Sequence, residues 1–161
     1  AGAVRASEPL QVIRYTRGGH YAVHSDSAWP GHRPISLVIY LRAPTAGGET
    51  CILPDALVER ALSTRAGGAV ASLLGALGVS SLLYHRDCAR ALAAVGARCV
   101  TPVPGAVVLW RNRWTGAGGL EVPGAHVACP VRAGEKWVAS GWVSDAEDGE
   151  EVCTPGRLCG P

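Results

Sequence analysis

AHVACPVRAGEKWVASGWV, residues 125–143, is the stretch that decides the fold, because it holds two apolar runs separated by a turn. Ala125–Val131 and Lys136–Val143 are both rich in residues that favour strands, and the RAGE segment between them suits a tight turn. The pattern predicts a β-hairpin. On that hairpin His126 and Lys136 would lie on facing strands, with Lys136 displaced along the pair.

Other parts of the chain also predict short strands. Leu10–Tyr15 and Ile35–Leu41 are apolar, β-branched runs, and the second reads as a buried strand with little alternation. Residues 43–54 predict a turn leading into a short strand, and Ala106–Trp110 follows the turn pair Pro-Gly. Many short strands with Gly and Pro turns indicate a mainly β fold, a sandwich or a barrel.

Residues 55–103 differ in character from both flanks. Asp55 is expected to cap a helix through Leu62, and the Ala/Leu spacing predicts further helices over Val70–Leu77 and Cys88–Val95. Several glycines in this region favour two or three short helices instead of one long one. A chain of 161 residues suits one domain. We therefore expect a single domain over residues 1–161 with a helical insert at about 55–103.

The bulk composition excludes some classes of function. A net charge of +2 is too small to indicate binding of nucleic acid or of an anionic membrane. No apolar run reaches the roughly 20 residues that a membrane span needs. The chain begins at Ala1 with no visible signal peptide, so we expect it to be a segment of a longer protein.

The six cysteines are compatible with disulfides in an oxidising compartment. Cys153 with Cys159 and Cys88 with Cys99 are the candidate pairs. No two cysteines have the CxxC spacing, which argues against a structural zinc site.

The segment YAVHSD, residues 21–26, is the first candidate for chemistry. On an extended segment His24 and Asp26 point to the same face, so both can bind one metal ion. Two His and one carboxylate leave open positions on the metal, which is typical of non-haem Fe(II) oxygenases. By itself a His-x-Asp pair is also typical of a polar loop. The candidates for a third ligand are His20, His32, His85 and His126.

His126 is favoured as the third ligand because it opens an apolar strand. Lys136 follows on the same predicted hairpin and is the only lysine among the 15 basic Lys and Arg residues. A cation at some distance from a metal suits a ligand that chelates at one end and carries a carboxylate at the other. Lysine is more commonly a surface residue, which is the alternative for Lys136.

Four blocks of the sequence resemble the prolyl 4-hydroxylase family of Fe(II)- and 2-oxoglutarate-dependent dioxygenases. EPLQVIRY (8–15) with GGHYAVHSD (18–26) resembles the block LQVxxYxxGGxYxxHxD. SLVIYL (36–41) followed by GGET (47–50) resembles TxLxYLN…GGET, and PGAVVLW (104–110) resembles xxGxAlxfw. HVACPVRAGEKWV (126–138) resembles HxxCPVxxGxKWv. The blocks stand in the family's order and cover roughly residues 8–54 and 104–143.

The resemblance implies a double-stranded β-helix, or jelly roll, as the catalytic domain, with Fe(II), 2-oxoglutarate, O2 and L-ascorbate taking part in the reaction. It implies three metal ligands, which are His24, Asp26 and His126. It implies that the C5 carboxylate of 2-oxoglutarate is bound by Lys136, with further co-substrate contacts from Tyr15, Thr50 and Tyr40. Core packing is an equal alternative for Tyr40. Residues implied to line a peptide groove are Tyr21, Arg33 and Trp142, and Cys129 is implied to be structural.

The expected reaction is hydroxylation of a C–H bond, with peptidyl proline as the substrate and a proline-containing peptide or protein as the partner. The alternatives are the same chemistry on a non-proline substrate and a non-catalytic binding domain that retains the fold. The sequence departs from the family at Ser27, where an aromatic residue is usual, in its short connection to Arg33 and in the long 55–103 segment. The endoplasmic reticulum or secretory pathway is the localisation that the resemblance implies.

Overall fold

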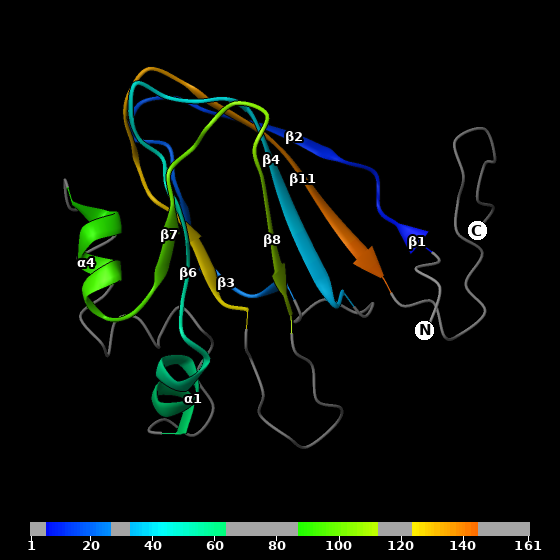
Figure 1. The fold of residues 1–161 in the computed structure, drawn as a ribbon, viewed down its shortest axis with the longest axis vertical. Helices are drawn as coiled ribbons and strands as arrows, with labels where there is room; N and C mark the ends of the chain where they lie inside the picture. The colour runs from blue at the N-terminus through cyan, green and yellow to red at the C-terminus, as the bar shows by residue number, and fades with distance from the viewer. Residues whose placement is uncertain (1–5, 27–32, 64–86, 113–123, 145–161) are drawn as a thin grey trace.

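Two antiparallel sheets that face each other form the core of the computed structural model, which describes residues 6–26, 33–63, 87–112 and 124–144 (Figure 1). The larger sheet has the order β1-β11-β4-β8, with β2 also paired to β11; the bounds are β1 Ala6–Ser7, β2 Gln11–Tyr15, β4 Ile35–Arg42, β8 Val107–Arg111 and β11 Lys136–Ser144. The smaller sheet has the order β3-β9-β6-β7; the bounds are β3 Tyr21–His24, β6 Thr50–Ile52, β7 Arg98–Val100 and β9 His126–Ala128. A two-stranded ladder joins β5, Ala46–Gly47, to β10, Val131–Ala133. The prediction of a mainly β fold is confirmed.

Side chains of the larger sheet alternate between the space facing the smaller sheet and the outer surface. On β4 the buried residues are Ser36, Val38 and Tyr40, while Leu41 is 49% exposed. The prediction that this strand is buried with little alternation is therefore wrong. One face of β4 is buried, whereas Ile35, Leu37 and Ile39 on the other face are only half-buried.

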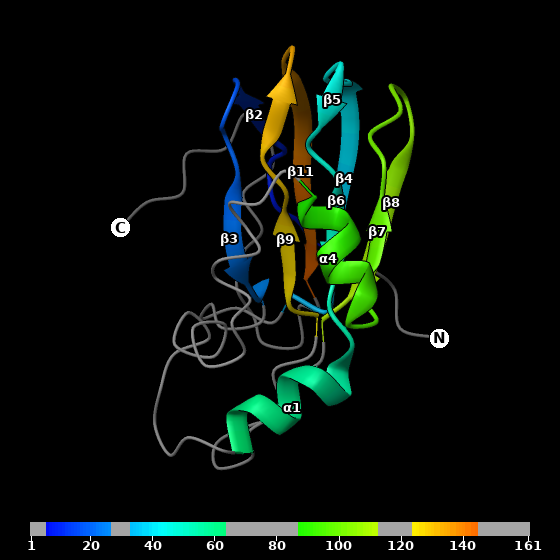
Figure 2. The same cartoon turned by 90° about the vertical axis from the view of Figure 1, so that its left-hand side faces the viewer.

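Two helices are described in the 55–103 region, α1 at Asp55–Ser63 and α4 at Cys88–Ala94, which confirms two of the three predicted helices. Figure 2 shows α4 lying against the face of the smaller sheet that points away from the larger sheet. Cys88 and Leu92 of α4 pack there against Val127 in a shared apolar cluster. The predicted helix at Val70–Leu77 lies outside the described residues. No described helix is long and apolar enough to cross a bilayer.

The predicted hairpin at residues 125–143 is wrong. β9 pairs with β3 and β6, whereas β11 pairs with β2, β4 and β1, so the two runs belong to opposite sheets. Pro130, which lacks a backbone N–H, ends the first run, and the chain then crosses to the larger sheet by way of β10. The crossing is tight, because a Cβ atom at Gly47 would lie 2.4 Å from the carbonyl oxygen of Pro130. A short apolar run followed by a glycine turn therefore marks a change of sheet here.

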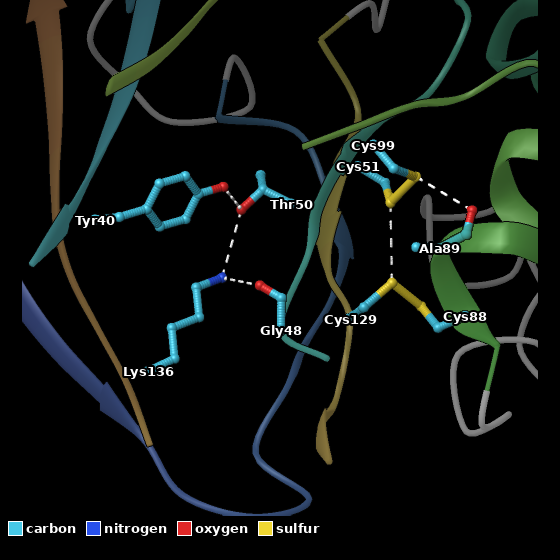
Figure 3. The surroundings of a disulfide bond; sticks show 9 residues. All are labelled: Tyr40, Gly48, Thr50, Cys51, Cys88, Ala89, Cys99, Cys129 and Lys136. Carbon is cyan, nitrogen blue, oxygen red and sulfur yellow. Dashed lines mark hydrogen bonds between the residues drawn. A yellow bond between two sulfur atoms is a disulfide. The ribbon is translucent and has the colours of Figure 1, made fainter. Parts of the chain in front are cut away.

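Two disulfides fasten the 88–99 region to the smaller sheet. Cys51 and Cys99 are directly paired residues of β6 and β7 and are joined by one bond. The other joins Cys88 at the start of α4 to Cys129 just after β9. Sulfur atoms of the two bonds, those of Cys51 and Cys129, lie 3.9 Å apart (Figure 3).

The disulfide predicted between Cys88 and Cys99 is wrong, because strand pairing places Cys99 opposite Cys51 in spite of their separation by 48 residues. The other predicted pair, Cys153 with Cys159, lies outside the described residues. The cysteine of the CPV block, Cys129, has a structural role in the second disulfide, as expected.

The pairing can be checked by proteolysis without reduction followed by mass spectrometry, which is expected to yield peptides that join Cys51 to Cys99 and Cys88 to Cys129. Replacing Cys88 and Cys129 together by Ser is expected to lower the free energy of unfolding by about 2–4 kcal/mol, because the unfolded chain loses a cross-link. Denaturant unfolding measures this loss. A linked peptide containing both Cys88 and Cys99 would contradict the assignment.

Candidate functional site

A cavity of about 410 Å³ lies between the two sheets. The side chains proposed from the sequence line it with one exception; those that line it are Tyr15, Tyr21, His24, Asp26, Arg33, Thr50, His126, Lys136 and Trp142. Tyr40 is the exception: it is fully buried behind the wall and donates a hydrogen bond from its hydroxyl to Thr50 Oγ1, 2.8 Å away. Residues far apart in the sequence therefore meet in one cavity.

Two histidines converge because their strands pair directly. His24 on β3 lies opposite His126 on β9, and the ring centroids are 4.1 Å apart. The register shifts between Tyr21 and His24, which is the mark of a bulge. The irregularity lets both Tyr21 and His24 face the cavity although they are three positions apart in the chain, and their rings are 4.2 Å apart.

Asp26 reaches the histidines from a turn. The extended segment ends at His24, so the strand alternation used to predict the convergence of His24 and Asp26 does not extend to Asp26. The convergence itself is present: Oδ1 of Asp26 lies 3.6 Å from Nε2 of His24, and Oδ2 lies 3.7 Å from Nε2 of His126. One donor atom from each of the three residues falls within 4.8 Å of the others.

The atoms that face one another in this cluster are lone-pair donors. Nδ1 of His24 lies 2.8 Å from the carbonyl oxygen of Ala22, and Nδ1 of His126 lies 2.9 Å from that of Gly124. A carbonyl oxygen only accepts, so each neutral ring carries its hydrogen on Nδ1 and turns a bare Nε2 toward Asp26. Burial and, after it, the nearby His24 lower the pKa of His126 to about 4, although Asp26 and the hydrogen bond to Gly124 act in the opposite direction.

Two imidazole nitrogens and a carboxylate oxygen fit a divalent metal ion with open positions left over. Without a cation, the arrangement would place mutually repelling lone pairs together in a largely buried site. Of the other histidines considered, His20 is not in the cluster and its Nδ1 lies 3.0 Å from the carbonyl oxygen of Gly18. His32 and His85 lie outside the described residues.

Lys136 approaches the cavity from the larger sheet, with only 2% of its surface exposed. Its ammonium donates to the carbonyl oxygen of Gly48 at 2.7 Å and to Oγ1 of Thr50 at 3.4 Å (Figure 3). The rings of Tyr15 and Tyr40 flank it, each with its centroid 5.4 Å from Nζ. In the described part of the chain no carboxylate forms an ion pair with Lys136. A buried ammonium without a carboxylate partner among the described residues suits an anionic ligand.

Burial lowers the pKa of Lys136 to about 8, and the charge of Glu49 partly opposes this. The backbone at Gly48 leaves little room beside the lysine: a Cβ there would lie 3.2 Å from its Cδ, and φ is +76°. Glycine at this position therefore lets the chain pass close to the ammonium while its carbonyl oxygen accepts a hydrogen bond.

The predicted groove residues all line the cavity, Tyr21 beside His24 and Arg33 against Trp142. Tyr21 is 49% exposed, and the guanidinium of Arg33 lies 4.3 Å from the ring centroid of Trp142. Arg33 is also held by Glu8, whose carboxylate accepts from Nε at 2.5 Å and from Nη2 at 2.6 Å. Glu8 therefore compensates the charge of Arg33 within the chain itself.

Three further residues at the site were not identified from the sequence. Ser36 donates to Oδ2 of Asp26 at 2.6 Å, and Asn112 donates to the oxygen of Ser36 at 2.6 Å. Trp110 packs on His126 with ring centroids 4.4 Å apart. Ser36 and Trp110 stood within the family-like blocks, which was the available signal. Nothing in the sequence marks Asn112.

A comparison with protein families identifies the superfamily to which the chain belongs. The sequence model described as "2OG-Fe(II) oxygenase superfamily" matches residues 10–144. The human transmembrane prolyl 4-hydroxylase is 29% identical over 168 residues, covering 88% of this chain and 30% of the relative. Prolyl 4-hydroxylase 2 of Arabidopsis thaliana is 33% identical over 144 residues, covering 84% of this chain and 41% of the relative. The chain thus spans less than half the length of these curated relatives.

Solved structures agree on the fold. The 2OG complex of the viral collagen prolyl hydroxylase from Paramecium Bursaria Chlorella virus-1 superposes with a TM-score of 0.51 at 20% identity, covering 88% of this chain and 61% of that one. A truncated form of the same viral enzyme gives a TM-score of 0.53 at 21% identity. Together with the antiparallel sheets, these matches confirm the predicted jelly roll.

The low pKa of Lys136 predicts a pH dependence for binding of 2-oxoglutarate. Only the charged ammonium attracts a carboxylate, so above pH 8 the dissociation constant is expected to rise by up to about tenfold per pH unit. Calorimetric titration between pH 7 and pH 9.5, roughly one pKa unit or more on either side, with Mn(II) as the metal would measure it. Lys136→Arg stays charged across this range and should remove the pH dependence. Parallel profiles for the two proteins would contradict the prediction.

Proposed function

Because the chain belongs to the 2OG-Fe(II) oxygenase superfamily, we propose that it is a 2-oxoglutarate-dependent dioxygenase that hydroxylates proline in peptides or proteins. The observation that carries the proposal is the presence, in one cavity, of a three-ligand cluster and a buried ammonium without a carboxylate partner among the described residues. The catalytic unit in the proposal is the whole chain, with the 55–103 segment as an insert in it.

His24, Asp26 and His126 are the proposed ligands of Fe(II). Each histidine offers Nε2, since Nδ1 is directed to a backbone carbonyl oxygen, and this bond also fixes the orientation of the ring. When bound, Fe(II) with 2-oxoglutarate and O2 supplies the oxidation of a substrate C–H bond, with release of succinate and CO2. The protein's own contribution is to hold the reactants in place and to keep water out of a largely buried site.

Lys136 is proposed to bind the far carboxylate of 2-oxoglutarate. Its ammonium is oriented by Gly48 and Thr50, and the Thr50 hydroxyl, which accepts from Tyr40, keeps its own hydrogen available for a ligand oxygen. Tyr15 lines the cavity beside the lysine and is proposed to contact the co-substrate directly. Tyr40 would act through Thr50, because it is fully buried and does not line the cavity.

A proline-containing chain fits the groove formed by Tyr21, Arg33 and Trp142. Aromatic faces pack well against the flat, apolar pyrrolidine ring, and a guanidinium can donate to a peptide carbonyl. Since Glu8 compensates the charge of Arg33, the groove does not call for an acidic substrate. The names of the relatives, which include prolyl 4-hydroxylases of human and Arabidopsis thaliana, support this substrate class.

L-Ascorbate is included in the proposal as the reductant that keeps the iron ferrous, and the secretory pathway is the proposed compartment. Two disulfides within the described residues suit an oxidising environment.

The reaction can be tested by incubating the chain with Fe(II), 2-oxoglutarate, ascorbate and a proline-rich peptide. The expected result is a peptide that gains one oxygen atom on proline, together with an equal amount of succinate. A matched peptide with every proline replaced by alanine is the control for the substrate. Succinate without hydroxyproline, which is uncoupled turnover, would favour the same chemistry on another substrate, and the absence of both products would contradict the proposal.

Removal of one proposed ligand should strongly weaken binding of the metal. His126→Ala is expected to weaken Mn(II) binding by more than about 100-fold, beyond the 10–100-fold typical of changes outside the ligand set. His20→Ala is the matched control, because this histidine is outside the cluster. Equilibrium dialysis measures both. Equal affinities of the His126→Ala variant and the unchanged chain would exclude the proposed metal site.

A further inference from the structure

A short hydrogen-bonded chain lies behind the carboxylate of Asp26. The Ser36 hydroxyl donates to Oδ2 of Asp26 at 2.6 Å, and Nδ2 of Asn112 donates to the Ser36 oxygen at 2.6 Å and to the carbonyl oxygen of Arg33 at 3.0 Å. The three side chains are deeply buried: 9% of Asp26, 1% of Ser36 and 6% of Asn112 are exposed. Backbone pairing sets the spacing, since Ser36 lies opposite Trp110 and the Asn112 N–H donates to Pro34.

The direction of each hydrogen bond follows from the chemistry of the groups. The carbonyl oxygen of Arg33 only accepts, so the nitrogen of the Asn112 amide must be the atom that faces it. The same nitrogen donates to Ser36, which occupies a lone pair of the hydroxyl and leaves its hydrogen to point at Asp26. The carboxylate of Asp26 only accepts, so the Ser36 hydroxyl donates to it, and the hydrogen bond from Asn112 reinforces this orientation of the hydroxyl.

Asn112 also touches the backbone that orients His126. A Cβ atom at Gly124 would lie 2.5 Å from Oδ1 of Asn112, so the two residues are in close contact. The carbonyl oxygen of Gly124 is the partner of Nδ1 of His126. Oδ1 of Asn112 is buried and has no hydrogen-bond partner among the described residues. An unpaired buried carbonyl oxygen costs free energy, which a purely structural residue at this position would avoid.

We propose that Asn112 is a positioning residue for the metal site, which holds Asp26 through Ser36 and supports His126 through Gly124. The inference rests on the proposed function, because it assigns to Asn112 and Ser36 the orientation of two of the three proposed ligands. Rotation of the carboxylate about its Cβ–Cγ bond would break the hydrogen bond from Ser36 to Oδ2, so this bond favours the orientation in which Oδ1 faces His24. Partners of this kind typically contribute 10–100-fold to metal affinity.

Binding of Mn(II) to the metal-free chain tests the inference without any need for turnover. Ser36→Ala and Asn112→Leu are each expected to weaken Mn(II) binding by about 10–100-fold. The leucine keeps the branched shape and the contact with Gly124, so it removes only the hydrogen bonds. Asn112→Ala removes the contact as well and should weaken binding further than Asn112→Leu. Ser36→Thr retains the hydroxyl and should bind within about threefold of the unchanged chain, a difference of less than 1 kcal/mol.

Two further measurements separate positioning from a general loss of stability. The double variant Ser36→Ala with Asn112→Leu should bind Mn(II) about as weakly as the weaker single variant, because both changes break one chain of bonds. The absorption spectrum of the Co(II) form should change in each single variant, since the ligand geometry changes. Arg111→Ala, on the exposed face of β8 beside Asn112, is the matched control and should alter neither affinity nor spectrum.

The results distinguish failure of this inference from failure of the proposed function. If the unchanged chain binds no Mn(II), the proposed metal site and this inference both fall. If it binds Mn(II) and the Ser36→Ala and Asn112→Leu variants bind within about twofold of it, the inference is wrong while the proposed function stands. A lower melting temperature of the metal-free variants with unchanged affinity and Co(II) spectrum would likewise overturn it.

Discussion

The direct pairing of His24 with His126 across β3 and β9 is the contact on which the rest of the site depends. Side chains alternate along a strand, so a slip of one residue in β9 would turn His126 toward α4 and bring Val127 to the cavity. Several bonds hold this register. Cys129 donates its N–H to Glu49 and is tied by a disulfide to Cys88, which fastens the end of β9 on two sides. The helical segment and its disulfides thereby contribute to the site without lining it.

The sequence predicted those parts of the fold that depend on local pattern. The runs at β2, β4 and β8 have the composition of strands, and Ala/Leu spacing marked α4. The prediction of a hairpin between β9 and β11 was wrong because two different structures share one local pattern. An apolar run followed by a glycine turn is found both at a turn within one sheet and at a crossing between two sheets. His126 and Lys136 still meet, because each lies on the inward face of its own sheet and the sheets face each other.

Contacts that depend on the pairing register of the strands could not be predicted from the sequence. Cys99 forms a disulfide with Cys51 because β6 and β7 pair at those residues. The prediction of Cys88 as its partner was based on their short separation in the chain. Ser36 reaches Asp26, and Asn112 reaches Ser36, only because β4 and β8 pair in one register. A serine and an asparagine carry no mark of such a role in isolation. The proposed ligands could be named from their residue types, whereas the groups proposed to orient them required the pairing of strands.

The charged side chains of the described cavity, Asp26 and Lys136, suit ligands of opposite charge. Asp26 supplies a buried carboxylate beside the two histidines, and Lys136 supplies a buried ammonium from the other sheet, so each side chain carries a burial cost that an opposite charge would offset. A divalent cation and a dicarboxylate that chelates it leave no net charge when combined with these two side chains. At the mouth, Glu8 already compensates Arg33. Under the proposed function, metal and co-substrate would therefore be selected by charge, whereas the substrate would be selected by shape and by neutral hydrogen bonds.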